Sequence, residues 1–147
     1  RLTSGRLNSL IIMNISVVEM WKDFAQYIIN NYSNAEKIVE VGAGKFHKVA
    51  SILEENLSSS IVMTDIKPSH GKIIKDNICN PDLKIYGGSS LIYSIRPQPE
   101  LMPHLIVVAE KIGADLIIKP FSTDSVNSSK MKLINYKRAT FYKASYK

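Results

Sequence analysis

A short apolar run that ends at two closely spaced glycines constrains this chain more than any other feature. Residues 38–41 read Ile-Val-Glu-Val and lead directly into Gly42 and Gly44. About 20 residues further on, a second apolar run ends at Asp65. Glycine has no Cβ, so the backbone there turns sharply and comes close to a ligand. This layout predicts a parallel sheet with a nucleotide-type ligand at its edge and Asp65 as an acceptor for a ribose diol.

Strands and helices are expected to alternate along the rest of the chain. Apolar residues at helical spacing predict helices at residues 16–31, 46–57 and from about 103 to 112, the last ended by Gly113. Short apolar runs predict strands at residues 37–41, 60–65, 90–95 and 115–119, a brief strand around 83–86, and a closing hairpin at 131–136 and 139–142. Residues 72–88 hardly leave room for a full crossover helix. The prediction is an α/β, Rossmann-like fold with a mostly parallel sheet, flanking helices and a C-terminal antiparallel hairpin.

Length and composition indicate one ordinary globular unit. The chain has 147 residues, of which 45% are hydrophobic, so a single domain over residues 14–147 is expected. Residues 1–13 are expected to be a lead that is disordered or foreign to the domain. No apolar run approaches the roughly 20 residues that span a bilayer, so no membrane partner is expected. The lone Cys79 excludes an internal disulfide and fits a reducing, cytoplasmic location.

The net charge of +6 is concentrated at the C-terminal end. Residues 125–147 contain no acid and six cations: Lys130, Lys132, Lys137, Arg138, Lys143 and Lys147. Aromatic residues are interleaved with them, a composition that suits RNA or another polyanion. The plainer interpretation is a solvated strand face with a frayed terminus. The charge therefore supports only a secondary hypothesis, a non-enzymatic adaptor that binds RNA or a protein through this basic end.

The turn that contains Gly42 and Gly44, the glycine turn, distinguishes between two cofactor classes. A third glycine would stand at His47 in the dinucleotide fingerprint and at Phe46 in the pattern of class I methyltransferases, and neither is present. Glu40, two residues before Gly42, resembles the acid that in those methyltransferases lies near the methionine moiety of S-adenosylmethionine. A carboxylate there would repel a pyrophosphate, which disfavours an NAD-binding oxidoreductase. A strand-to-helix turn without any ligand, its pocket crowded by Phe46, remains an alternative.

Two further acids occupy positions that the same resemblance makes functional. Asp65 would bind the ribose, and the alternative is a turn aspartate tied to Lys67 or Ser69. Asp76 stands where such enzymes hold the adenine amino group, although its spacing from Asp65 is shorter than usual. A surface turn is the alternative for Asp76.

The segment Tyr93-Ser-Ile-Arg-Pro-Gln-Pro99 follows a predicted strand. Ligands of open α/β sheets lie at that edge, so Ser94 and Arg96 are expected to bind substrate. A guanidinium is no base near neutral pH, but it holds a carboxylate or phosphate through paired donors. The competing interpretation is an ion pair from Arg96 to Glu40 or Asp65.

Other chemistries find little support. His47, His70 and His104 share no metal-ligand spacing, and Cys79 has no partner cysteine. Lys45 follows the glycines without the P-loop pattern, and no serine stands in a nucleophile elbow. No metal site is expected, and no catalytic residue is assigned.

Four segments together resemble a small uncharacterised archaeal protein family: VEVGAGKFHKVA, TDIKPSHG, LIYSIRPQPEL and GADLIIKP. The resemblance implies a truncated Rossmann fold of the class I methyltransferase type. It also implies S-adenosylmethionine, or a related adenosine compound, as ligand at Glu40, Gly42, Gly44, Asp65 and Asp76. Whether the chain is an active methyltransferase stays open, because the family has no assigned reaction.

Overall fold

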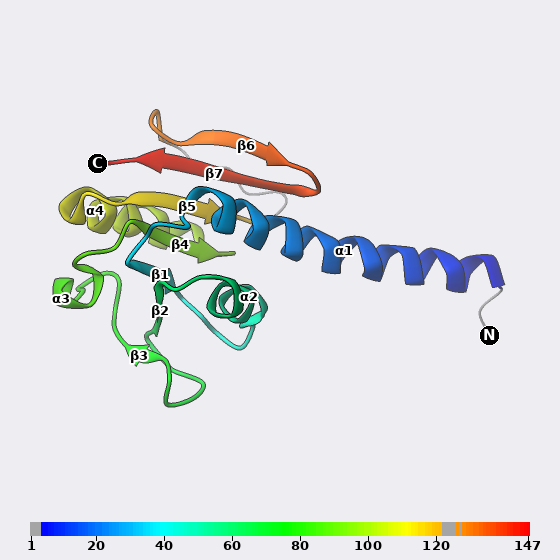
Figure 1. Cartoon of the computed structure of the whole chain (residues 1–147), viewed down its shortest axis with the longest axis horizontal. Helices are drawn as coiled ribbons and strands as arrows, with labels where there is room; N and C mark the ends of the chain where they lie inside the picture. Colours follow the sequence, from blue (N-terminus) through cyan, green and yellow to red (C-terminus); the bar gives the residue numbers. More distant parts are fainter. Residues whose placement is uncertain (1–3, 122–125, 127) are drawn as a thin grey trace.

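One seven-stranded sheet organises the part of the chain that the structure describes (Figure 1). The computed structural model describes residues 4–121, 126 and 128–147, and of residues 4–13 only the backbone. The strands are β1 (Lys37–Val41), β2 (Ser60–Asp65), β3 (Ile74–Lys75), β4 (Leu91–Ile95), β5 (Asp115–Lys119), β6 (Lys132–Tyr136) and β7 (Ala139–Ser145). Their spatial order is β3-β2-β1-β4-β5-β7-β6. β1 to β5 pair in parallel, whereas β7 runs antiparallel to both β5 and β6. The predicted Rossmann-like fold with a C-terminal hairpin is confirmed.

Helices cover both faces of this sheet. The helical elements are α1 (Ser4–Asn31), α2 (Lys48–Asn56), α3 (Leu83–Tyr86), a 3-10 turn (Pro99–Leu101) and α4 (Met102–Ile112). Ile38 and Tyr93 face the core under α1 and α2, whereas Val39 and Ile92 face the core under α4. Successive side chains of a strand point to opposite faces, so the central strands need apolar residues at nearly every position. This explains why β1, β4 and β5 are largely apolar and do not alternate between apolar and polar residues.

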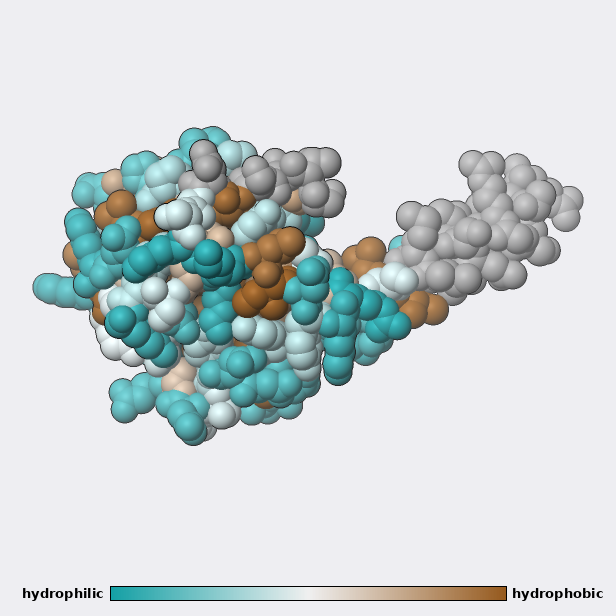
Figure 2. All heavy atoms as spheres, turned by 90° about the horizontal axis from the view of Figure 1, so that it is seen from above, coloured by the Kyte–Doolittle hydropathy of each residue, from teal (hydrophilic) through white to brown (hydrophobic). Residues whose placement is uncertain are grey.

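The first helix is longer than the sequence pattern predicted. It begins at Ser4 rather than Ser16 and extends beyond the sheet as an arm (Figure 1). Its C-terminal half is anchored by Trp21 and Phe24, both buried. Ile15, Val17 and Val18 are exposed, and Figure 2 shows hydrophobic surface where the arm leaves the body. The amphipathic spacing that marked Ser16 as the start therefore reports where burial begins, not where the helix does.

Two local predictions between β2 and β4 were wrong. Leu83–Tyr86, expected as a strand, forms the short helix α3, because the side chain of Asp82 caps it by accepting the Lys84 N–H at 3.1 Å. The two-residue strand β3 was missed, and it pairs with the end of β2. Residues 72–88 contain only the two-residue β3 and the four-residue α3, so the expectation that they leave no room for a full crossover helix is confirmed. Elsewhere, Gly113 ends α4 with φ at 75°, as predicted.

None of the helices in the described part of the chain is both long enough and apolar enough to cross a membrane.

Candidate functional site

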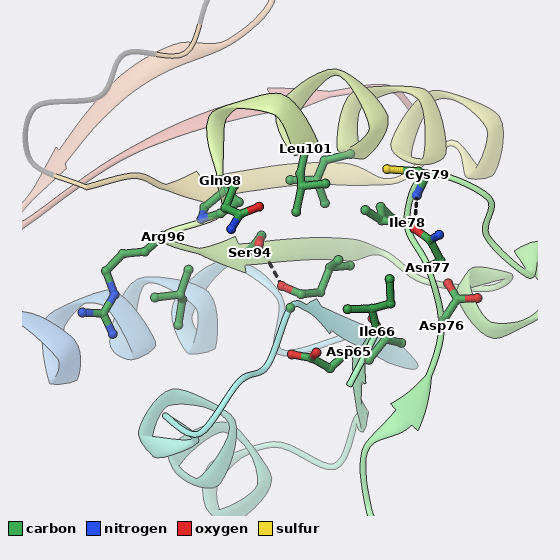
Figure 3. A pocket seen from close by; sticks show the side chains of 16 residues that line it. Asp65, Ile66, Asp76, Asn77, Ile78, Cys79, Ser94, Arg96, Gln98 and Leu101 are labelled. Carbon is green, nitrogen blue, oxygen red and sulfur yellow. Dashed lines mark hydrogen bonds between the residues drawn. The ribbon is translucent and has the colours of Figure 1, made fainter. Parts of the chain in front are cut away.

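A cavity of about 500 Å³ lies at the carboxyl edge of the sheet, where β1, β2 and β4 end (Figure 3). Five residues singled out from the sequence line it: Gly42, Asp65, Asp76, Ser94 and Arg96. Arg96 stands at one end of the cavity, and Asp76 and Asn77 stand at the other. The other two predicted residues, Glu40 and Gly44, line an adjoining cavity of about 260 Å³ that shares Gly42 and Arg96 with the larger one. The fold thus brings the seven residues to one edge.

The glycine turn adopts the backbone that its sequence predicted. Gly42 and Gly44 have φ values of 73° and 53°, a left-handed region that side chains disfavour. The N–H groups of Gly42 and Ala43 both donate to the Thr64 carbonyl, at 2.9 and 3.0 Å, which ties the turn to the end of β2. A Cβ on Gly42 would lie 3.9 Å from the Ser94 Oγ. Glycine therefore keeps open the space between the ends of β1 and β4.

Asp65 fixes the loops on either side of the cavity. Its Oδ2 accepts the Gly44 N–H at 2.8 Å, and its Oδ1 accepts the Lys67 N–H at the same distance. The tie to Lys67 is the turn that we considered as the alternative role, and Asp65 is nevertheless half-buried in the cavity lining. An ionised carboxylate has about four acceptor positions. Two of them remain for hydroxyl groups of a ligand.

Asp76 is held in a similar way at the opposite end of the cavity. Its Oδ2 accepts the Tyr86 O–H at 2.6 Å and its Oδ1 accepts the Asp82 N–H at 3.0 Å. The neighbouring Asn77 accepts the Cys79 N–H through its side chain. Burial, followed by the hydrogen bond to Asp76, raises the pKa of Tyr86 above its ordinary range. This end of the cavity is a preformed polar rim, floored by the buried Ile78.

Glu40 is buried beneath the glycine turn, with 1% of its surface exposed. The Tyr93 hydroxyl donates to its Oε1 at 2.6 Å, because the parallel register of β1 and β4 sets Tyr93 directly beside Glu40. Burial raises the pKa of Glu40 to about 7, and the hydrogen bond from Tyr93 opposes that rise. A cation bound near Glu40 would favour the ionised carboxylate, and the attraction between the two charges would stabilise the bound cation.

Ser94 and Arg96 differ in what holds them. Ser94 is buried, and its hydroxyl donates to the Val41 carbonyl at 2.8 Å. Arg96 is exposed, has a left-handed backbone with φ at 50°, and donates its N–H to the Lys119 carbonyl at 2.6 Å. Among the described residues no carboxylate forms a salt bridge with Arg96. The ion pair with Glu40 or Asp65 that we considered is therefore not formed.

Three aromatic rings surround the Arg96 guanidinium instead. Its Cζ lies 5.5 Å from the ring centre of Trp21, 5.6 Å from that of Phe46 and 5.8 Å from that of Phe121. Phe46 also packs on Trp21, with ring centres 4.7 Å apart. Phe46 lines the smaller cavity, but it does not line the larger one. The aromatic ring at the missing third glycine thus leaves the main cavity open.

Sequence reasoning missed three residues around this site: Trp21, Tyr93 and Phe121. Trp21 comes from a helix far away in sequence, so no local pattern marked it. Tyr93 carried a usable signal, because it lies within a predicted strand and its side chain ends in a polar hydroxyl. Phe121 follows the end of β5 by two residues, so the strand-end rule applied to it as well.

The histidines give no sign of a metal centre. The rings of His47 and His70 meet edge to face with centres 4.9 Å apart, and the His47 Nε2 lies 2.8 Å from the Gly44 carbonyl. Within the described residues, no group of three or more His, Cys, Asp or Glu side chains is placed to hold a metal ion.

The strand order, the two-sided helical cover and the glycine turn define a protein with a Rossmann-like α/β fold. Residues 21–146 match the model of the uncharacterised protein family UPF0146, and the chain belongs to that family.

Relatives in this family cover most of the chain. A UPF0146 protein of Methanothermobacter thermautotrophicus is 48% identical over 124 residues, which are 84% of this chain and 93% of that protein. A UPF0146 protein of Archaeoglobus fulgidus is 41% identical over 122 residues, 80% of this chain and 89% of its own. Both organisms are archaea, as the sequence resemblance implied.

Solved structures with a similar fold include methyltransferases. An S-adenosyl-L-methionine methyl transferase from Silicibacter pomeroyi superposes with a TM-score of 0.57 at 12% identity, covering 97% of this chain and 99% of its own. An RNA methyltransferase from Salinibacter ruber in complex with S-adenosyl-L-homocysteine also gives 0.57, at 9% identity, covering 84% and 90%. At such low identity the likeness concerns the fold alone.

Proposed function

We propose that this chain binds S-adenosylmethionine, or a related adenosine compound, along the cavity between Asp76 and Arg96. The observation that carries the proposal is the open cavity of about 500 Å³ at the carboxyl edge of β1, β2 and β4. Its volume lies within the range of about 300–1,000 Å³ that small-molecule sites occupy. Methyltransferases with the same fold, one of them in complex with S-adenosyl-L-homocysteine, support this ligand class.

The polar groups are spaced for a ligand with an adenosine end and an amino-acid end. An adenine ring fits the Asp76 end, above Ile78, where Asp76 has acceptor capacity left for an amino group. The ribose hydroxyls would meet the free acceptor positions of Asp65. The amino-acid end would reach the smaller cavity, where an ammonium group would meet Glu40 beside Gly42 and Gly44. S-adenosylmethionine carries its own activated methyl group, so a methyltransferase built on this site depends on positioning more than on a protein nucleophile.

Isothermal titration with S-adenosylmethionine and S-adenosylhomocysteine tests this proposal. Asp65→Asn removes a charged acceptor, and we expect this variant to bind S-adenosylmethionine about tenfold more weakly. A loss of that size corresponds to one hydrogen bond to a charged group. The matched control is Glu55→Gln, the same loss of charge at an exposed position on α2. It should bind like the wild type. Binding heat that is absent at millimolar ligand, or equal in Asp65→Asn and the wild type, would contradict the proposal.

NAD is the competing ligand for this site, and a titration followed by NADH fluorescence separates the two. Glu40 is buried directly beneath the turn that would have to hold a diphosphate. A diphosphate at this turn would therefore be repelled by Glu40 once that group is ionised. Saturable NADH binding would favour the dinucleotide.

A second candidate function rests on the basic C-terminal hairpin. Several of its lysines lie over tyrosine rings: Lys143 over Tyr27 and Tyr32, Lys137 over Tyr136, and Lys130 over Tyr146. As an RNA-binding surface, this hairpin should lose affinity steeply as salt rises. Neutralising Lys137 and Arg138 together should weaken binding of a labelled single-stranded RNA, measured by fluorescence anisotropy. Binding that is absent or independent of salt would remove this candidate.

A further inference from the structure

The smaller cavity is lined by Glu40, the glycine turn, Phe46, Arg96 and Phe121. It contains more charged groups than the adenosine ligand would neutralise. Glu40 and the turn would serve the ligand's ammonium end. Arg96 and Lys45 add two cations to the same cavity lining. The amino-acid end of the ligand carries one carboxylate, which would neutralise one of these two cations and leave the other for a second anion.

Lys119 adds a third positive charge to this region. The register of β4 and β5 pairs Ile95 with Lys119, so Arg96 directly follows the residue beside Lys119, and its N–H bonds to the Lys119 carbonyl. Burial, followed by the nearby charge of Arg96, lowers the pKa of Lys119. Two cations held this close repel each other. Such an arrangement becomes favourable when an anion joins it.

The surroundings of Arg96 restrict which part of the guanidinium a ligand would meet. Trp21, Phe46 and Phe121 lie around it at 5.5 to 5.8 Å, so contact with a ligand is left to its N–H donors. Those donors form a planar fork that matches a carboxylate or a phosphate. Phe121 is 52% exposed, and it offers an apolar surface beside the fork. The strained backbone of Arg96, with φ at 50°, holds the side chain at this place.

We propose that Arg96, supported by the charge of Lys119, recognises an anionic group on the acceptor molecule, and that Phe121 contacts the acceptor's apolar part. The acceptor would then be a small organic carboxylate or phosphate, bound beside the adenosine ligand at the ends of β4 and β5. This inference rests on the proposed function, because an acceptor is needed only if the chain binds a methyl donor. The anion site itself is tested without any adenosine ligand.

The test follows the Arg96 Nε–H resonance by NMR while benzoate, phenyl phosphate or neutral benzyl alcohol is added. Both anions should shift the resonance in a saturable manner, the alcohol should not, and the tighter of the two shows whether a carboxylate or a phosphate is preferred. For variants lacking this resonance, binding is measured by isothermal titration. Arg96→Gln should weaken binding by about tenfold or more, and Lys119→Met should weaken it less. Arg138→Gln, which removes an exposed cation on the hairpin, should have no effect.

A second variant guards against misfolding. Arg96→Gly accepts the left-handed backbone without strain, so a folded Arg96→Gly protein that no longer binds either anion supports the site. Saturation that persists in Arg96→Gln, or an equal shift from benzyl alcohol, would overturn the inference.

Repeating the titration with saturating S-adenosylhomocysteine separates the two proposals. Anion binding that persists beside the adenosine ligand supports an acceptor site. Anion binding that is lost would show that Arg96 holds the carboxylate of the adenosine ligand, which overturns the acceptor assignment and leaves the proposed function intact. Anion binding without any S-adenosylhomocysteine binding would overturn the proposed function and the acceptor assignment with it, and would leave Arg96 as an anion site only.

Discussion

Gly42 and Gly88 form a matched pair that separates folding from ligand binding. Their φ values are 73° and 82°, and a Cβ on either residue would meet no atom closer than 3.9 Å. Gly42 lines both cavities, whereas Gly88 lies between α3 and β4 and lines neither. Replacing either glycine with alanine should therefore lower the free energy of unfolding by the same amount. Only Gly42→Ala should also weaken ligand binding.

The folding cost can be worked out from the backbone. A left-handed conformation costs an alanine about 1–2 kcal/mol, and alanine returns about 0.4–1 kcal/mol by restricting the unfolded chain. The net loss is about 1 kcal/mol for each variant. In a domain near 150 residues this lowers Tm by about 4 °C. Urea and thermal unfolding should give equal losses for Gly42→Ala and Gly88→Ala.

The binding cost arises only at Gly42. Its new methyl group would stand between the ends of β1 and β4, beside the Ser94 Oγ. A ligand packed on Gly42 meets an overpacked contact that costs about 1–3 kcal/mol, which is about tenfold or more in affinity. Isothermal titration with S-adenosylhomocysteine should show this loss in Gly42→Ala and wild-type affinity in Gly88→Ala. Equal affinity in both variants would refute the placement of the ligand against the glycine turn.

Two predictions concern the buried pair of Glu40 and Tyr93. Burial raises the pKa of Glu40 from 4.5 to about 7, so between these values the folded chain holds a proton that the unfolded chain has released. The free energy of unfolding should therefore fall as pH rises from 4.5 to 7 and level off above. Urea titrations across this range should show that fall in the wild type and lose it in Glu40→Gln; parallel profiles would contradict it. Tyr93→Phe removes the donor to Glu40, so it should destabilise the fold by about 1–3 kcal/mol and move the end of the fall to higher pH. An unchanged end point would show that the hydroxyl does not support the ionised carboxylate.

The central strands were predictable because a strand buried on both faces has apolar residues at nearly every position. β1 and β5 are short runs rich in β-branched residues and bounded by turn residues, and this length and composition favour a strand over a buried helix segment. α3 was mistaken for a strand because Leu-Lys-Ile-Tyr is too short to show a helical period. The capping residue Asp82 was the signal to use there. β3 has no local signal, since its two residues are strand only through pairing with Thr64 and Asp65.

The site was predictable as far as strand ends determine it. Gly42, Asp65 and Arg96 each follow or end a parallel strand, and parallel strands end at one edge of the sheet. The partners of these residues depend on register and on helix placement, which no single segment contains. Glu40 meets Tyr93 because β1 and β4 align in one register out of several. Trp21 reaches Arg96 only because α1 crosses that edge.

The ring of Phe46 decides whether the glycine turn opens into a ligand site, and its partners explain why the site stays open. Phe46 stands where the methyltransferase pattern has a third glycine. A ring there would fill the turn if it had no better contact. Trp21 on α1 supplies that contact at 4.7 Å, and the Arg96 guanidinium adds a cation–π contact at 5.6 Å. Phe46 therefore packs at the boundary with α1, where it forms a wall of the smaller cavity. The departure from the glycine pattern thus leaves the larger cavity open and adds an aromatic wall beside Arg96.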